Sequence, residues 1–106
     1  LTGPIGGKTG TTNSNSDGWF IGFVPRLVSG CWVGGENRDI HFDEMRMGQG
    51  ATMALPIWAK YMKKVFSDKS LGYKSDEQFN IPEDFQLCDK AANDSITDNG
   101  IDDIFQ

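Results

Sequence analysis

The sequence predicts a small α+β domain in which a three-stranded antiparallel sheet packs against one helix. Segments rich in branched and aromatic residues follow one another on short turns, which is typical of an antiparallel meander. A single stretch with helical periodicity then follows, over about residues 54–66. A chain of 106 residues is also short enough that we expect at most one small domain with a modest core.

The first predicted strand runs from Gly6 to Thr12, after a lead in which Pro4 disfavours helix. Glycines at positions 6, 7 and 10 weaken this strand unless another group must approach its backbone closely. We therefore expect a ligand along its edge; the alternative is that the glycines only mark β-bulges. A turn is predicted from Asn13 to Gly18, where Asn, Ser, Asp and Gly gather.

The second and third predicted strands are joined by a tight turn at residues 25–27, where proline fixes the backbone angle. The second strand, Trp19 to Val24, is apolar on both faces, so we expect it to be central and covered on each side. The third strand, Val28 to Val33, ends at a pair of glycines.

Residues 36–50 are polar and contain the only histidine of the chain. A metal site can be imagined from four of their side chains: Asp39, His41, Asp43 and Glu44. Ligands at every second position suit a strand edge better than a closed coordination sphere, so we predict no metal site. We expect a solvated loop that three apolar residues attach to the domain: Ile40, Phe42 and Met45.

The predicted helix runs from Ala54 to Phe66, with lysines on the face opposite its apolar residues. Pro56 is compatible with this helix only in its first turn. We expect the apolar stripe to pack on the sheet as core rather than to bind a ligand; its members are Ala54, Ile57, Trp58, Tyr61, Met62, Val65 and Phe66.

Charge divides the chain unevenly. Residues 1–66 hold seven Lys and Arg against five Asp and Glu, whereas residues 67–106 hold three against ten. We therefore predict an acidic tail over residues 67–106 that solubilises the protein, or packs lightly on a neighbour through isolated apolar anchors such as Phe85 and Phe105. Its negative charge disfavours nucleic acid as a partner.

The two cysteines, Cys31 and Cys88, are too far apart in sequence for a metal knuckle or a redox pair, and we expect both to be unpaired. No apolar run approaches the roughly 18 residues that a membrane span needs, and no signal peptide is present. Taken alone, the chain is expected to be soluble.

Chemistry is concentrated in the stretch Gly6-Gly7-Lys8-Thr9-Gly10-Thr11-Thr12. A phosphate-binding P-loop needs a glycine six residues before the lysine, where this chain has Thr2, and a helix directly after it, where this chain has turn residues. The pattern therefore favours the other known use of such a run, the Lys-Thr-Gly strand of penicillin-binding and β-lactamase active sites.

The order and spacing of several motifs resemble the end of the transpeptidase domain of class A penicillin-binding proteins, over about residues 3–66. The motifs that carry the resemblance are Lys-Thr-Gly-Thr-Thr-Asn at 8–13, Asp-Gly-Trp-Phe-Ile-Gly-Phe at 17–23, the strand 28–34, Gly-Gln-Gly at 48–50 and Ala-Leu-Pro-Ile-Trp at 54–58. The loop at 40–42 and the acidic tail are similar to Bacteroides-type members.

This resemblance implies a partial serine β-lactamase/transpeptidase-like fold, the second half of a five-stranded sheet. It also implies a parent enzyme without a cofactor that cross-links peptidoglycan stem peptides, is acylated by β-lactams, and is anchored by a segment outside this chain on the periplasmic face of the inner membrane. Residues 1–66 would be the C-terminal portion of the domain, and residues 67–106 its acidic tail.

The resemblance assigns roles to four residues of the first strand. Lys8 would be catalytic, raising the positive potential and hydrogen-bonding the serines of the other two motifs. Thr9 and Thr11 would hold the substrate carboxylate through their hydroxyls, the Thr11 backbone N–H would be an oxyanion donor, and Gly10 would leave room for the acyl group. Thr12, Asp17 and Trp19 are expected to be structural.

Two of the three motifs of such a site are absent from this chain. No serine has a lysine three residues later or an asparagine two residues later, so Ser-x-x-Lys and Ser-x-Asn must lie outside it. We therefore expect the isolated chain to be inactive, because the nucleophile is missing.

Two other functions remain open on the sequence. One is a hydrolytic relative, a carboxypeptidase or β-lactamase, which uses the same strand chemistry. The other is a non-catalytic module that binds a partner. The outer side of residues 28–33 would lack a strand partner in this chain, so we also expect self-association there or pairing with the remainder of the domain.

Overall fold

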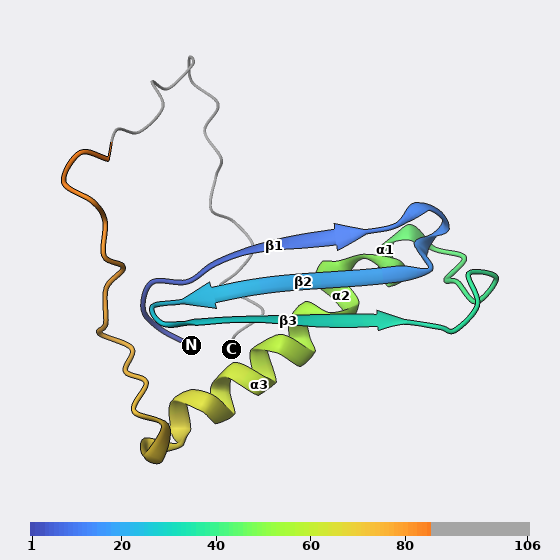
Figure 1. The fold of residues 1–106 in the computed structure, drawn as a ribbon. Helices are drawn as coiled ribbons and strands as arrows, with labels where there is room; N and C mark the ends of the chain where they lie inside the picture. The colour runs from blue at the N-terminus through green and yellow to red at the C-terminus, as the bar shows by residue number, and fades with distance from the viewer. Residues whose placement is uncertain (86–106) are drawn as a thin grey trace.

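A computed structural model describes residues 1–85 of the chain (Figure 1). Three strands, β1 (Gly6–Thr11), β2 (Asp17–Val24) and β3 (Leu27–Gly34), form one antiparallel sheet in the order β1-β2-β3. One long helix, α3 (Leu55–Ser67), lies across this sheet. The predicted α+β fold class is confirmed. The shorter helices are η1 (Asn13–Asn15), α1 (Met45–Gly48), α2 (Gly50–Met53) and η2 (Lys69–Leu71).

The register of the sheet fixes which side chains share a face. Lys8 pairs with Ile21, and Trp19 pairs with Trp32. Because neighbours along a strand point to opposite faces, Phe20 and Val24 face the helices whereas Trp19, Ile21 and Phe23 face away from them. The three outward residues of β2 are 42–45% exposed.

The prediction that β2 is covered on both faces is therefore wrong for the described residues. Helices α2 and α3 both contact the same face of the sheet: a Cβ at Gly18 would meet Met53, and one at Gly22 would meet Trp58. On the outer face, Phe79 packs edge-on against Phe23, with ring centroids 5.6 Å apart. An apolar pattern shows that a face can be buried, but it does not show that the covering element belongs to the same chain.

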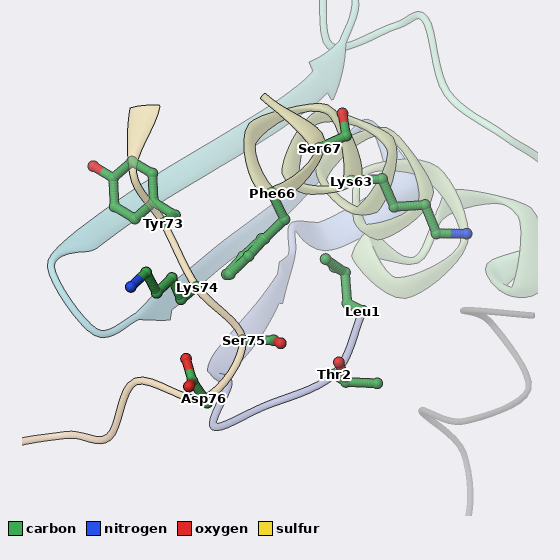
Figure 2. A pocket seen from close by; sticks show the side chains of 9 residues that line it. All are labelled: Leu1, Thr2, Lys63, Phe66, Ser67, Tyr73, Lys74, Ser75 and Asp76. Carbon is green, nitrogen blue, oxygen red and sulfur yellow. The ribbon is translucent and has the colours of Figure 1, made fainter. Parts of the chain in front are cut away.

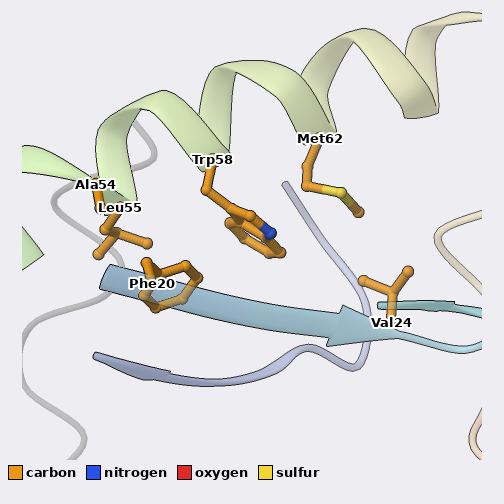
Figure 3. Packing of buried hydrophobic residues seen from close by; sticks show 6 residues of the cluster. All are labelled: Phe20, Val24, Ala54, Leu55, Trp58 and Met62. Carbon is orange, nitrogen blue, oxygen red and sulfur yellow. The ribbon is translucent and has the colours of Figure 1, made fainter. Parts of the chain in front are cut away.

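The core lies between β2 and α3 (Figure 3). Phe20 meets the indole of Trp58 edge-on at a centroid distance of 4.9 Å, and Met62 is fully buried beside them. Pro56 falls in the first turn of α3, as predicted, where its missing N–H breaks no helical bond. Ile57 and Tyr61 were expected in the stripe but are about half exposed; the buried residues of α3 are Leu55, Trp58, Ala59, Met62 and Val65.

The indole of Trp58 lies directly over Gly22. A Cβ at Gly22 would be 2.2 Å from the indole Cζ2, far closer than any real contact. The indole N–H donates to Ser29 Oγ at 2.8 Å, and the side chain is 1% exposed. Glycine at position 22 and the hydroxyl at position 29 therefore set the position of this ring between helix and sheet.

Residues 36–50 only partly match the predicted solvated loop. Residues 36–47 are exposed, but α1 and α2 follow within the stretch 45–53. Gly48 and Gly50 are buried, and a Cβ at Gly50 would lie 2.3 Å from the Trp19 carbonyl oxygen. The glycines allow this corner to approach the backbone of the sheet, which a count of apolar residues does not reveal.

The segment after α3 returns to the turn between β2 and β3. Arg26 sits in this turn at a φ of 71°, and its Nε donates to Glu77 Oε2 at 2.7 Å. Its Nη2 donates to the Gly72 carbonyl at 2.9 Å, and the guanidinium lies over the Tyr73 ring, 4.9 Å from the centroid. The hydrogen bond from Arg26 lowers the pKa of Glu77 below its ordinary value.

Gly72 and Glu77, which follow the predicted boundary between residues 66 and 67, thus contact the turn of the sheet. The division of the chain into a domain portion, 1–66, and an acidic tail, 67–106, remains a prediction. The predictions that concern residues 86–106, including those for Cys88 and Phe105, lie outside the described residues. Cys31 is a half-buried free thiol in β3. Within residues 1–85, no helix is both long and apolar enough to cross a bilayer.

Candidate functional site

The predicted site strand, β1, lies at one edge of the described sheet, with β2 as its neighbour. The N–H of Thr12 donates to the Asp17 carbonyl at 3.1 Å, so the backbone of Thr12 points toward β2. In an antiparallel ladder the peptide groups of successive residues point alternately toward and away from the partner strand. The N–H groups of Thr11 and Thr9 consequently point toward the open edge.

A cavity of about 540 Å³ lies beside this edge. Thr9 and Thr11 both line it, because alternate residues of a strand share a face. The structure therefore brings these two predicted hydroxyls together. The other lining residues come from the turn after β1 and from the α1–α2 corner: Thr12, Asn13, Ser14, Asn15, Met45, Gln49 and Ala51.

Lys8 does not share the face of Thr9 and Thr11. It pairs with Ile21 across the strands and points to the outer, exposed face of the sheet. Its Nζ donates to the Thr9 carbonyl at 2.9 Å, which brings the ammonium to the backbone of the same strand. The structure thus places the cation next to the strand that carries the hydroxyls, but outside the lining of the cavity.

The α1–α2 corner is the part of the site that sequence reasoning missed. The N–H of Gly50 donates to Thr11 Oγ1 at 3.2 Å, which joins this corner directly to β1. A Cβ at Gly50 would meet the carbonyl oxygens of Trp19 and Gly10, at 2.3 and 2.7 Å. The signal available in the sequence was the pair of glycines at 48 and 50 just before the helical pattern.

The turn at the end of β1 is held by a side-chain network. Thr12 Oγ1 accepts from the Asp17 N–H at 3.0 Å and lies 3.1 Å from Ser16 Oγ. The Trp32 indole N–H donates to Asp17 Oδ1 at 3.0 Å, which joins the turn to β3. These bonds fix one wall of the cavity and agree with the structural role predicted for Thr12 and Asp17.

Two other features of the molecule bear on where the site lies. In the part of the chain that the structure describes, no group of three or more His, Cys, Asp and Glu side chains could hold a metal ion. A larger cavity, of about 660 Å³, lies between the end of α3 and residues 73–76 (Figure 2). None of the four predicted site residues lines it, so the candidate site is the cavity beside β1.

Three relatives found by sequence comparison all carry one name, penicillin-binding protein 1A. No family model matches the chain. Penicillin-binding protein 1A of Neisseria meningitidis is 42% identical over 69 residues, which cover 61% of this chain. The protein of the same name from Aquifex aeolicus is 46% identical over 61 residues, or 58% of the chain, and that from Rickettsia conorii is 36% identical over 98 residues, or 91%. The chain spans only 8–11% of the length of these relatives.

Comparison of the fold with solved structures also finds a penicillin-binding protein 1A. The crystal structure of penicillin-binding protein 1A from Haemophilus influenzae superposes with a TM-score of 0.58 at 37% sequence identity, over 74% of this chain and 11% of that one. This likeness in sequence and in fold identifies the chain as corresponding to the C-terminal part of the transpeptidase domain of class A penicillin-binding proteins.

Proposed function

We propose that this chain is part of a peptidoglycan transpeptidase and forms the wall of its active site that binds the substrate carboxylate and the oxyanion. The observation that carries the proposal is the arrangement of β1. The hydroxyls of Thr9 and Thr11 line one cavity, and the N–H of Thr11 points to the open edge of the same strand. The likeness to penicillin-binding protein 1A supports this use of the strand.

The chemistry follows from these donors. A peptide or β-lactam that ends in a carboxylate accepts hydrogen bonds from the two hydroxyls, which orients its carbonyl carbon at the strand edge. When a serine attacks that carbon, negative charge develops on the carbonyl oxygen and the Thr11 N–H stabilises it. One such donor is typically worth about 2.7 to 4 kcal/mol of the activation barrier.

The attacking serine and its activating lysine belong to the rest of the domain in this proposal. Lys8 then acts from the outer face of β1, where its ammonium already reaches the Thr9 carbonyl. A four-carbon stem lets this cation turn toward serines that pack against the strand, and its charge favours a bound carboxylate. Gly10 leaves the strand edge without a Cβ where the acyl group would lie.

The partners and the location of the parent follow from the same proposal. Its ligands are peptidoglycan stem peptides and β-lactams, and it acts on the periplasmic face of the inner membrane, held there by a segment outside this chain. The remainder of the transpeptidase domain covers the free edge of β3. In its absence, the free edge of β3 supports self-association of this chain.

Labelling with a fluorescent penicillin tests the proposal. The parent protein should become covalently labelled, whereas the isolated chain should not, because the chain lacks the nucleophile. In the parent, Lys8→Ala should lower the labelling rate by at least 100-fold, on the order of the loss from one acid-base or electrostatic group.

Lys60→Ala is the matched control, since Lys60 is an exposed lysine on α3. It should leave the labelling rate of the parent unchanged. Covalent labelling of the isolated chain, or an equal rate for the Lys8→Ala parent and the unaltered one, would contradict the proposal.

A further inference from the structure

We propose that the backbone amide of Gly50 positions the Thr11 hydroxyl so that its proton is kept for the carboxylate of the ligand. This inference rests on the proposed function and adds a positioning residue to it. It comes from one contact between two parts of the chain that lie far apart in sequence, the Gly50 N–H and Thr11 Oγ1, 3.2 Å apart.

The direction of this hydrogen bond carries the inference. A backbone N–H can only donate, so the Thr11 hydroxyl must accept here. A threonine hydroxyl has one proton and two acceptor lone pairs, and the bond from Gly50 uses one lone pair. The proton therefore stays available for an acceptor inside the cavity that Thr11 lines. A carboxylate is the strongest common acceptor for it, because a charge-assisted bond is roughly twice as strong as a neutral one.

The amide can do this only if its own position is fixed, and the α1–α2 corner fixes it. The Gln49 carbonyl accepts from the N–H groups of Thr52 and Met53 at 2.9 and 3.0 Å, so Gly50 begins a closed helical turn. Gly50 also lies so close to β2 that a Cβ at Gly18 would be 3.3 Å from the Gly50 Cα. The corner thus holds its amide against β1 before any ligand arrives, as a preorganised donor must be held.

The test uses the parent protein and a pair of β-lactams, one with a free carboxylate and one with that carboxylate as a methyl ester. The measured quantity is the preference for the carboxylate, as the ratio of the two acylation rate constants. Gly50→Ala pushes a Cβ against backbone oxygens and moves the amide away from Thr11. It should lower the preference on the order of 10-fold, the usual effect of one hydrogen bond to a charged group.

Gly48→Ala is the matched control. A Cβ at Gly48 would meet the Asn15 side chain at 2.3 Å, so this change crowds the same corner to a similar degree. The Gly48 amide is not the one that bonds to Thr11, so Gly48→Ala should slow both ligands alike and keep their ratio. An equal fall of the ratio in both variants would overturn the inference, since it would indicate a general effect of packing.

Changes at Thr11 keep the inference testable even if Gly50→Ala does not fold. Thr11→Val removes the hydroxyl and should lower the preference on the order of 10-fold or more. Thr11→Ser keeps a hydroxyl that Gly50 can still hold, so it should retain the preference within about 3-fold. A Ser variant as impaired as the Val variant would show that the amide does not position the hydroxyl.

The same measurements separate this inference from the proposed function. If Thr11→Val leaves the preference for the carboxylate unchanged, the proposed role of Thr11 is wrong. If Thr11→Val lowers the preference and a folded Gly50→Ala does not, the proposed role stands and only the positioning by Gly50 fails. In the Thr11→Val background, Gly50→Ala should cause no further fall in the ratio, because the two changes remove one interaction.

Discussion

Replacing Gly22 by alanine should destabilise the domain strongly, although alanine is normally better than glycine inside a strand. The new Cβ would lie 2.2 Å from Trp58 Cζ2 and 2.5 Å from Cε2, whereas carbon atoms in contact are about 3.5–4.0 Å apart. The indole would have to retreat by more than an ångström. The ring of Phe20, at a centroid distance of 4.9 Å, and the bond to Ser29, at 2.8 Å, both oppose this movement.

The expected cost combines three effects. Overpacking of a core costs about 1–3 kcal/mol. An indole N–H drawn away from Ser29 while still buried costs about 1–3 kcal/mol more. The better strand propensity of alanine offsets about 0.5–1 kcal/mol of this. We therefore expect Gly22→Ala to lower the free energy of unfolding of this chain by about 3 kcal/mol.

Urea unfolding followed by far-UV circular dichroism measures this change. Gly30→Ala is the control, because the one tight contact of a Cβ at Gly30 would be with the flexible end of Ile21, at 3.0 Å. It should change the free energy of unfolding by less than about 0.5 kcal/mol. In a Trp58→Phe background, where the smaller ring reaches less far over the sheet, Gly22→Ala should cost less than about 1 kcal/mol. An equal cost of Gly22→Ala with Trp and with Phe at position 58 would refute this reasoning.

Three further predictions concern other contacts of the sheet. Ser29→Ala should lower the free energy of unfolding by about 1–3 kcal/mol, because it leaves the buried Trp58 N–H without its acceptor; an unchanged urea midpoint would contradict this. The Glu77 pKa is lowered in the folded state, so the stabilisation from its bond to Arg26 should be full above the unfolded pKa, about 4.3, and be lost as the pH falls from there through the lower folded pKa. Melting temperatures of the unaltered chain and Glu77→Gln should therefore differ at pH 7 and converge as the pH falls through the lowered folded pKa of Glu77. Val28→Lys on the free edge strand should reduce the self-association of this chain in light scattering, and a monomer without this change would contradict the expected edge pairing.

The local pattern of the sequence predicts the sheet and the long helix well, because each depends on periodicity within one segment. The run of aromatic and branched residues in β2 and the steps of three and four in α3 are visible without any knowledge of their neighbours. The side of α3 that faces the sheet is harder to predict from the sequence. Ile57 and Tyr61 fit the apolar period but are half exposed, while the small Ala59 is buried.

Only part of the candidate site could be predicted, because the periodicity of one segment does not report its contacts with distant segments. Thr9 and Thr11 share a face because strand geometry requires it, and the cavity beside them confirms that geometry. The contribution of Gly50 depends on a contact across the fold, and the glycine itself carries no side chain that would suggest a role. The exposure of the outer face of β2 likewise could not be predicted from its own residues, because an apolar pattern does not show which element covers a face.

The attachment of residues 72–77 to Arg26 also has an electrostatic consequence. It holds Glu77 at the turn between β2 and β3. The α1–α2 corner, whose residues help to line the cavity, lies toward the opposite end of the sheet (Figure 1). Thr9 and Thr11 pair with Phe20 and Gly18, which lie four and six residues from the turn end of β2, and a strand rises about 3.4 Å per residue, so roughly 14–20 Å separates these positions from the turn. This is about twice the distance of about 8 Å over which physiological salt screens exposed charges. An anionic ligand at β1 is therefore spared repulsion from the carboxylate that Arg26 holds.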